Sequence, residues 1–502
     1  MSEALPKKWS ILSLLDRDNV SQRMGWIIVV YATLWALAGI LLDHTLPYDA
    51  VEAYHWGAAL EFGSPKNPYL VGAVATLGQM LPIPFPMTWY LAHFIAMGGG
   101  LWGCWRLCQR LYTPQWMAVV AILALSLTAT INIDLIPYND NYLLMMMWPY
   151  VWLYFIKAVY DDTRYWLALG IVMALATMAK YSTVIFLPFM LAVVLVDSKA
   201  RSALWSGYLL AGLAAGTLLV LPNLWWLSQH DFSAFHWFHS RVVGGFNLEN
   251  VELYLSVFYN LILVTVVLMA CGFRWQRPQT REQKAFIFIA VAPIVMLFIY
   301  FTLKGGARTE WMMPFAVPAS LALTLCLRAK KKAACRVPLW IFLVMSLVIW
   351  GGYITAKIHE RNHAHSPRDQ VAELSVELNA WWQEQFHRPL AYAGGSRMGD
   401  WLAVYAPDHP RAPIQWSTSP YPNVFTPGLT EAELYRAGAL WVGSANVPCD
   451  DGQTLEVAPS ASDALKQRIH MDTFTLRDAH SGVPRFSVCV GVLAPSDESA
   501  SQ

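Results

Sequence analysis

The sequence predicts an all-α polytopic membrane protein with a small α/β domain at its C-terminus, and three observations favour this fold class. The 502-residue chain is 56% hydrophobic and only 14% charged, whereas soluble domains average about 25% charged residues. Apolar runs long enough to cross a bilayer recur along the first 356 residues. After residue 356 the chain becomes more polar, with short strand-like runs between turn residues.

The apolar runs define eleven expected membrane spans. Two of them are short and are separated only by "AKYS", so they could also form one long helix. We expect two helices joined by a tight turn, because Lys180 in the middle of a bilayer would be costly. The expected spans are roughly 24–43, 88–108, 116–133, 142–159, 165–179, 182–197, 204–225, 251–272, 285–303, 311–328 and 337–356.

Basic residues gather on alternate loops, which predicts the orientation of the chain. The runs "RWQRPQTREQK" and "RAKKKAACR" fall on the same side as the N-terminus, and the positive-inside rule makes that side cytoplasmic. The N-terminus shows no apolar core or cleavage site, so we expect no cleaved signal peptide. The predicted domains are a cytoplasmic N-terminus (1–23), a transmembrane domain (24–356) and a soluble domain outside the cytoplasm (357–502).

The C-terminal region contains the pattern of a small α/β domain. "SPRDQVAELSVELNAWWQEQF" has helical apolar spacing, with Ser366 and Pro367 at the expected first positions. The runs "PLAYAGG", "GALWVGS" and "RFSVCVGVL" indicate strands. Cys449 and Cys489 are the cysteines of this region, and the sequence leaves open whether they form the disulfide that an oxidising compartment permits.

Charged and polar residues concentrate in the loops on the side opposite the basic runs. The net charge of +1 argues against nucleic acid as a partner. In a chain with so few charges, this concentration of acidic and basic groups indicates a functional site at the membrane surface. The residues are Asp49, Glu52, Lys66, Asp134, Asn139, Asp140, Asn141, Lys180, Tyr181, His230, Asp231, His236, His239, Arg241, Lys304 and Arg308.

Two of these loops have helical spacing. Asp49, Glu52 and Trp56 fall at i, i+3 and i+7, so a helix would place both carboxylates on one face. Phe232, Phe235 and Phe238 form an apolar stripe beside histidines and an arginine. This second pattern predicts an amphipathic helix that lies on the membrane surface.

Six segments of the chain carry a family resemblance: "DAVEAYHWG", "SPKNPYL", "YNDNYLLMMMW", "LALGIVMALATMAKYSTVIFLPFML", "PNLWWLSQHDF" and "GGARTEWMMP". With these segments, the chain resembles the bacterial branch of the protein O-mannosyltransferase and aminoarabinose transferase superfamily, the GT-C glycosyltransferases that depend on polyprenyl phosphate. Two departures from the family pattern are Asn67 and Tyr69 after Lys66, and the two residues that separate Asp49 from Glu52.

The resemblance implies a GT-C fold of about eleven transmembrane helices in a bacterial inner membrane, with a periplasmic C-terminal domain. The donor would be a monosaccharide on polyprenyl phosphate, and the periplasmic acceptor would be lipid A, another envelope glycan or a protein. By resemblance, Asp49 is the general base or the residue that orients the acceptor. Glu52 shapes the acceptor site or holds a divalent ion, and no metal is assigned.

The remaining site residues follow from the same resemblance. Lysine and arginine stabilise charge on a departing phosphate, so Lys66, Lys180 and Arg308 are the expected donor phosphate contacts. The expected pocket residues are Asp140, Asn141, Tyr181, His230 and Arg241.

Two other functions remain open from the sequence. A transporter or flippase of a lipid-linked sugar would predict charges in mid-membrane, broken helices and an internal repeat. The sequence shows no convincing repeat, and its unusual charges lie at the ends of the expected spans. A non-catalytic scaffold would leave the concentration of charges in the loops unexplained.

Overall fold

The chain forms two compact units, which we describe separately. In the computed structural model, the helical unit comprises Met1–Gly39, Tyr90–Leu224 and His236–Thr355, and the mixed unit comprises Ile40–Trp89, Trp225–Phe235 and Ala356–Gln502. Part of the predicted N-terminal segment 1–23, and Asp134, lie outside the described residues. The structure describes residues 11–16, 19–43, 45–128, 132, 139–306, 308–362, 366–413, 426, 428–449, 455, 457, 461–478 and 480–496.

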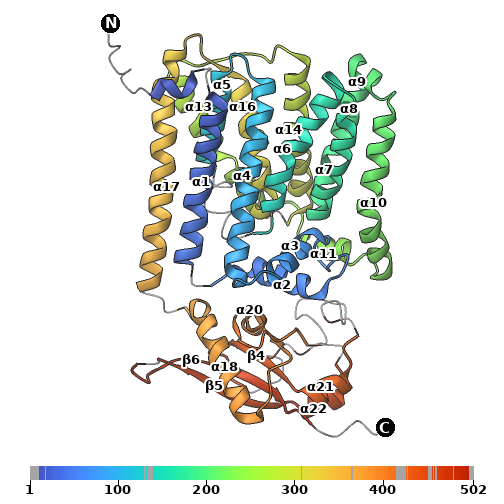
Figure 1. Cartoon of the computed structure of the whole chain (residues 1–502), viewed down its shortest axis with the longest axis vertical. Helices are drawn as coiled ribbons and strands as arrows, with labels where there is room; N and C mark the ends of the chain where they lie inside the picture. Colours follow the sequence, from blue (N-terminus) through green and yellow to red (C-terminus); the bar gives the residue numbers. More distant parts are fainter. Residues whose placement is uncertain are drawn as a thin grey trace. The chain divides into compact units, whose positions relative to one another are not determined.

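The helical unit is a bundle of long helices that run roughly parallel to one another (Figure 1). Two short strands, β1 (Arg274–Trp275) after α13 and β2 (Leu327–Arg328) after α16, pair as a minimal antiparallel sheet. The helices that lie wholly or mainly in this unit are η1 (Ile11–Leu15), α1 (Val20–Leu42), α4 (Phe85–Leu111), α5 (Trp116–Ala124), η2 (Leu125–Leu127), α6 (Tyr142–Tyr160), α7 (Tyr165–Ala179), η4 (Tyr181–Ile185), α8 (Phe186–Val196), α9 (Ser198–Ala203), α10 (Gly207–Gln229), α11 (Ser233–Arg241), α12 (Leu248–Ser256), α13 (Tyr259–Ala270), α14 (Arg281–Lys304), α15 (Thr309–Met312), η5 (Met313–Phe315), α16 (Ala316–Leu325), η6 (Lys332–Cys335) and α17 (Arg336–Asn362).

Within the described residues, each of the eleven expected spans overlaps helical structure. The span 116–133 is helical up to Leu127, the span 251–272 is divided between α12 and α13, and the span 311–328 ends in β2. The tight turn at "AKYS" is confirmed, because α7 ends before Lys180, whose backbone is extended (φ −160°, ψ 131°), and η4 begins directly after it. Of the predicted stripe Phe232, Phe235 and Phe238, the last two lie in the helix α11, whereas Phe232 precedes it with a left-handed backbone (φ 49°).

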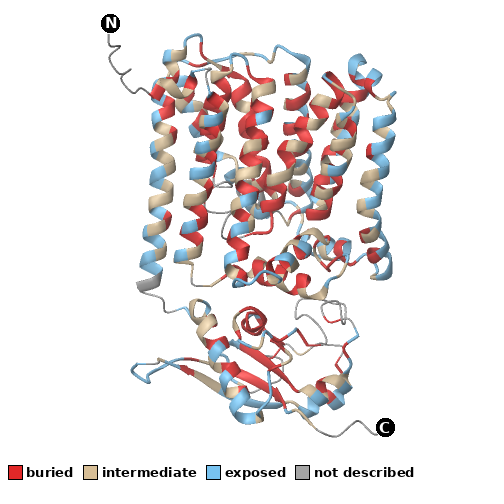
Figure 2. Cartoon of the chain, viewed as in Figure 1, coloured by how far each residue is buried: buried red, intermediate tan, exposed pale blue. Residues whose placement is uncertain are grey.

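The bundle has the surface of a protein that contacts lipid. Five described helices are long and apolar enough to cross a membrane by length and composition: α1, α6, α10, α14 and the segment Lys332–Glu360, which covers most of α17. In α6, 72% of the most apolar 18-residue stretch is buried, whereas in α10 only 11% of the corresponding stretch is buried. Figure 2 shows the exposed faces of α10 and α17, where Leu210, Leu218 and Leu347 are 60–70% exposed. Apolar surface of this extent is unfavourable in water and suits a lipid environment.

The mixed unit joins the first loop to the C-terminal region. Its sheet has the order β3-β4-β6-β5, with β3 parallel to β4 and the other pairs antiparallel. Its elements are α2 (Tyr48–Ala59), α3 (Leu70–Gln79), η7 (Pro367–Gln370), α18 (Val371–Phe386), β3 (Ala393–Gly395), α19 (Arg397–Asp400), α20 (Leu402–Tyr405), α21 (Glu431–Ala437), β4 (Ala439–Ala445), α22 (Asp463–Arg468), β5 (His470–Arg477) and β6 (Pro484–Leu493).

The C-terminal elements agree with the sequence prediction except for one missed strand. Ser366 and Pro367 begin a 3-10 turn that leads into α18, and the three strand-like runs become β3, β4 and β6. The strand β5 was not predicted, although its alternation of polar and apolar residues gave a signal. It lies at the edge of the sheet and pairs with β6 along its whole length.

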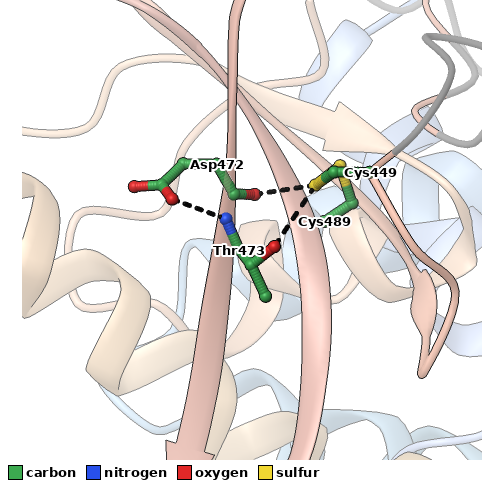
Figure 3. Close-up of a disulfide and its surroundings, with 4 residues drawn as sticks. All are labelled: Cys449, Asp472, Thr473 and Cys489. Atoms are coloured by element: carbon green, nitrogen blue, oxygen red, sulfur yellow. Dashed lines mark hydrogen bonds between the residues drawn. A yellow bond between two sulfur atoms is a disulfide. The ribbon is translucent and has the colours of Figure 1, made fainter.

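The disulfide that the sequence left open is present. Cys489 lies in β6, and its sulfur is bonded to that of Cys449, with the two Cα atoms 5.1 Å apart (Figure 3). The carbonyl oxygen of Asp472 lies 2.9 Å from the Cys449 sulfur, and Thr473 pairs with Cys489 across the strands. The bond therefore ties the segment after β4 to the central part of the sheet.

Removing this disulfide should destabilise the C-terminal region. It closes a loop with a sequence separation of 40 residues, and cross-links of this kind contribute about 2–4 kcal/mol, mainly by restricting the unfolded chain. We expect the double variant Cys449→Ser/Cys489→Ser to lower the melting temperature of the purified protein. Cys271→Ser, at a free cysteine, is the control. Equal melting temperatures for the double variant and the wild type would contradict the prediction.

Candidate active site

The helix α2 carries the two carboxylates predicted from the first loop. Pro47 precedes the helix, Asp49 lies in its first turn, and Leu60 ends it with a left-handed backbone (φ 56°). A carboxylate in a first turn interacts favourably with the helix dipole. Asp49 and Glu52 are three residues apart and therefore project from the same side of α2, as predicted.

The helix α3 packs closely against α2 and fixes its orientation. Thr76 donates a hydrogen bond to the carbonyl of Gly57 at 2.9 Å. A Cβ atom on Gly57 would lie 2.8 Å from the backbone nitrogen of Thr76, so this close approach requires glycine. Gln79 also donates to the carbonyl of Tyr54 at 2.8 Å.

The turn between α2 and α3 holds Lys66 over these carboxylates. The Ser64 hydroxyl accepts hydrogen bonds from the backbone nitrogens of Lys66 (3.3 Å) and Asn67 (2.9 Å), and it donates to the Asn67 carbonyl (2.9 Å). Ser64 and Asn67 are each 2% exposed. Asn67, a departure from the family pattern, takes part in closing the turn through its backbone.

Lys66 forms an ion pair with both carboxylates. Its Nζ atom lies 2.7 Å from Glu52 Oε2 and 3.4 Å from Asp49 Oδ1, and 5.9 Å from the centre of the Trp56 ring. The Asp49 side chain is 25% exposed and that of Glu52 11%. Asp49 is therefore the more accessible carboxylate and has the longer contact with the lysine.

His230 belongs to the same unit and is linked to this loop through Trp226. The Trp226 indole donates to Glu61 Oε2 at 2.8 Å. The His230 ring stacks on Trp226 with 4.0 Å between ring centres, and His230 Nδ1 lies 2.8 Å from the Trp226 carbonyl. The predicted pocket residue His230 and Glu61 thus both contact the same buried tryptophan, Trp226.

A second polar cluster lies in the helical unit at the start of α6. Lys180 Nζ lies 2.6 Å from Asp140 Oδ1 and 2.8 Å from Asn141 Oδ1. Asp140 and Asn141 are 3% and 2% exposed, and Asn139 accepts from the backbone nitrogen of Asn141 at 2.9 Å. The anionic partner that Lys180 requires is therefore Asp140, a residue of the protein itself.

The predicted residue Arg308 lies on a loop attached to this cluster. Asn141 donates to the carbonyl of Glu310, in α15, at 2.9 Å, and Arg308 is the exposed residue that directly precedes α15.

The other predicted pocket residue of this region, Tyr181, donates to Asn223 Oδ1 at 2.9 Å.

Glycines bring the Arg308 loop against the segment that carries Arg241. The backbone nitrogen of Gly245 donates to the Lys304 carbonyl at 3.0 Å, and a Cβ atom on Gly306 would lie 2.4 Å from the Arg241 carbonyl oxygen. Arg241, Lys304 and Arg308 are exposed. Among the described residues none of the three has an ion pair with a carboxylate. The sequence analysis named Lys304 only as a charged loop residue. The glycine contacts that group it with the two arginines could not be predicted from the spacing of residues in the sequence.

The predicted residues thus fall into two groups, one in each unit. Asp49, Glu52, Lys66 and His230 lie in the mixed unit, and Asp140, Asn141, Lys180, Tyr181, Arg241 and Arg308 lie in the helical unit. Over the described ranges, no group of three or more His, Cys, Asp or Glu side chains is arranged to hold a metal ion. Glu52, for which the resemblance allowed a divalent ion, is paired with Lys66.

Comparisons with known proteins agree on the class of protein. Residues 66–226 match the family model of dolichyl-phosphate-mannose-protein mannosyltransferases. The chain is 21% identical over 339 residues to the lipid A galacturonosyltransferase RgtD of Rhizobium johnstonii, which covers 66% of this chain and 71% of that protein. The crystal structure of ArnT from Cupriavidus metallidurans, bound to undecaprenyl phosphate, matches with a TM-score of 0.61 and 12% identity, over 94% of this chain and 99% of that one.

The fold and these matches identify the chain as a membrane-embedded glycosyltransferase. The resemblance to GT-C glycosyltransferases that depend on polyprenyl phosphate, and the predicted fold class, are confirmed. The matches support a glycosyltransferase over a transporter.

Proposed function

We propose that the protein transfers a monosaccharide from a polyprenyl-phosphate donor to a glycolipid acceptor at the outer face of a bacterial inner membrane. The observation that carries this proposal is that Lys66 pairs with Asp49 and Glu52, the two carboxylates on α2. Transfer needs a base for an acceptor hydroxyl and a cation for the departing phosphate. The cluster contains both types of group.

In the proposed reaction, the acceptor oxygen attacks the anomeric carbon of the donor sugar. The bond from that carbon to the phosphate oxygen breaks, and polyprenyl phosphate leaves with the bonding electron pair. Asp49 takes the proton of the attacking hydroxyl, or orients an acceptor that is already anionic. Glu52 holds Lys66 in place and shapes the acceptor side.

Lys66 has the role of contacting the donor phosphate. Its contact with Asp49 is 3.4 Å, against 2.7 Å with Glu52. A phosphate oxygen can replace Asp49 as a partner of Lys66 while Glu52 continues to hold the lysine. Donor binding would then release Asp49 to act on the acceptor.

Further cations and an apolar groove support a long-chain phosphate as the donor. Arg308, together with Arg241 and Lys304, supplies exposed cations at the ends of helices, where they can contact phosphate oxygens. A groove of roughly 470 Å³ between α7, α8 and α10 has almost entirely apolar walls, including Leu187, Leu213 and Val220. Such a groove suits an isoprenoid chain. Lys180 is proposed as a phosphate contact or as a structural partner of Asp140, two roles that the Discussion separates by experiment.

The proposed acceptor is a glycolipid. RgtD, named as a lipid A galacturonosyltransferase, supports lipid A as the first acceptor to test. Other envelope glycans and proteins are tested beside it. Incubation of the purified protein with a radiolabelled polyprenyl-phosphate sugar and each acceptor should move the label to the acceptor. Release of free sugar alone, or no reaction with any acceptor, would contradict the proposal.

The proposed orientation places the N-terminus in the cytoplasm and the C-terminal region in the periplasm. The positive-inside bias supports it, and the disulfide between Cys449 and Cys489 fits an oxidising compartment.

Cysteine labelling should confirm this orientation. Lys331 and Glu384 are exposed, and one predicted span, 337–356, lies between them. We expect a membrane-impermeant thiol reagent to label Glu384→Cys in intact spheroplasts, and Lys331→Cys only after permeabilisation. The wild type measures the background from native cysteines. Labelling of both variants from the same side would refute the eleven-span topology.

A further inference from the structure

Two exposed arginines of the C-terminal region stack on aromatic rings next to the loop-one carboxylates. The guanidinium of Arg397 lies 4.7 Å from the centre of the Tyr48 ring, and that of Arg368 lies 6.0 Å from the centre of the Trp401 ring. The two rings contact each other, with centres 5.5 Å apart. Tyr48 and Glu52 are four residues apart on α2 and therefore project from the same face. The array thus adjoins Glu52, which shares Lys66 with the proposed base Asp49.

Hydrogen bonds hold the rings of this array in place. The Tyr48 hydroxyl donates to Asp400 Oδ2 at 2.8 Å, and the Trp401 indole donates to the Leu46 carbonyl at 3.2 Å. Asp400 is 2% exposed. Burial, followed by the charge of Asp400, raises the pKa of Tyr48 far above its usual value, so the phenol remains a neutral donor. The rings are therefore a fixed support for both guanidinium groups.

The two arginines are available to a ligand because the nearby carboxylates have other partners. The carboxylates of Asp49 and Glu52 are paired with Lys66, and that of Asp400 accepts from Tyr48. Within the described ranges, neither Arg368 nor Arg397 forms an ion pair with a carboxylate. A guanidinium without an ion-pair partner has N–H groups that can bind phosphate oxygens in bidentate fashion.

We propose that Arg368 and Arg397 bind a phosphate group of the acceptor glycolipid and bring its hydroxyl to Asp49. This inference rests on the proposed function. A phosphate could also come from the donor, but that phosphate is assigned to Lys66. Without Arg368 and Arg397, the carboxylates around α2 would outnumber the cations and repel an anionic acceptor. The two arginines offset this excess of negative charge: Lys66, Arg368 and Arg397 then match Asp49, Glu52 and Asp400 in number.

The test compares acceptors that differ only in phosphate. Transfer by the full-length protein is measured with lipid A and with enzymatically dephosphorylated lipid A. Arg397→Gln and Arg368→Gln should each raise the KM for lipid A about 10-fold or more, because each removes charge-assisted hydrogen bonds. The kcat at saturating lipid A and the KM for the donor should stay within about 3-fold of the wild type. With the dephosphorylated acceptor, variants and wild type should have equal KM values.

Arg468→Gln is the matched control. Arg468 is also exposed, and it stacks on the Tyr435 ring at the same distance of 4.7 Å, but on α22 rather than beside α2. This variant should match the wild type with both acceptors. A rise in the donor KM instead of the acceptor KM would overturn the assignment to the acceptor. An unchanged lipid A KM in the double variant, or an equal rise with both acceptors, would overturn the phosphate site itself.

A binding measurement keeps this inference separate from the proposed function. Association of the purified protein with vesicles that contain lipid A, without donor, should be about 10-fold or more weaker for the double variant and should be less sensitive to salt. If the wild type binds lipid A through the arginines but transfers no sugar, the proposed function fails and the binding site stands. If transfer occurs and both proteins bind equally, the binding site fails alone.

Discussion

Asp49→Asn is expected to lower the rate of sugar transfer by about 10²–10⁴-fold, the usual loss when a general base is removed. The change preserves size and keeps an oxygen that can accept from Lys66, but it removes the charge and the basicity. Asp49 is the more exposed of the two carboxylates on α2 and makes the longer contact with Lys66. Donor binding should therefore change little, and single-turnover transfer with saturating donor is the measurement.

The control for this variant is Glu61→Gln in the same loop. Glu61 accepts a hydrogen bond from Trp226, which an amide oxygen can also accept, so transfer should remain near the wild-type rate. A hydroxyl acceptor must lose a proton, whereas a phosphate nucleophile is already ionised. A deficit well below 10²-fold would thus indicate a phosphate nucleophile. Near-normal transfer by Asp49→Asn with every acceptor would remove Asp49 from the mechanism and make Glu52 the base.

The sequence predicted the local structure of the site well, because local structure follows from spacing. The i, i+3 placement of Asp49 and Glu52 required only that the segment be helical. The break at Lys180 followed from the cost of a charge in lipid. The missed strand β5 lies at the edge of the sheet and includes charged and polar residues that weaken its apolar pattern.

The partners of the site residues could not be predicted, because they come from distant parts of the chain. Asp400 lies 352 residues from Tyr48, and Asp140 lies 40 residues from Lys180. Only the fold brings such pairs into contact. Roles assigned by resemblance therefore treated Lys66 and Lys180 as cations waiting for a phosphate, whereas each is paired with a carboxylate of the protein.

The structure changes the effect expected from removing Lys180. Asp140 is 3% exposed, and its ion pair with Lys180 is 2.6 Å long. Removal of one partner from a buried pair typically costs about 3–5 kcal/mol, because the other charge remains without compensation. Lys180→Met should therefore lower the melting temperature of the purified protein markedly.

A double variant separates the structural role of Lys180 from a role in donor binding. Lys180→Met/Asp140→Asn removes both charges, so much of the lost stability should return, since neutral replacement of a buried pair is often tolerated. If Lys180 serves only to compensate Asp140, the double variant should also recover its affinity for the polyprenyl-phosphate donor. If Lys180 contacts the donor phosphate, the double variant should be folded and yet bind the donor about 10-fold or more weakly, as expected for a lost charge-assisted hydrogen bond. A single Lys180→Met variant with unchanged melting temperature would contradict the structural role, because the buried carboxylate of Asp140 would then need no partner.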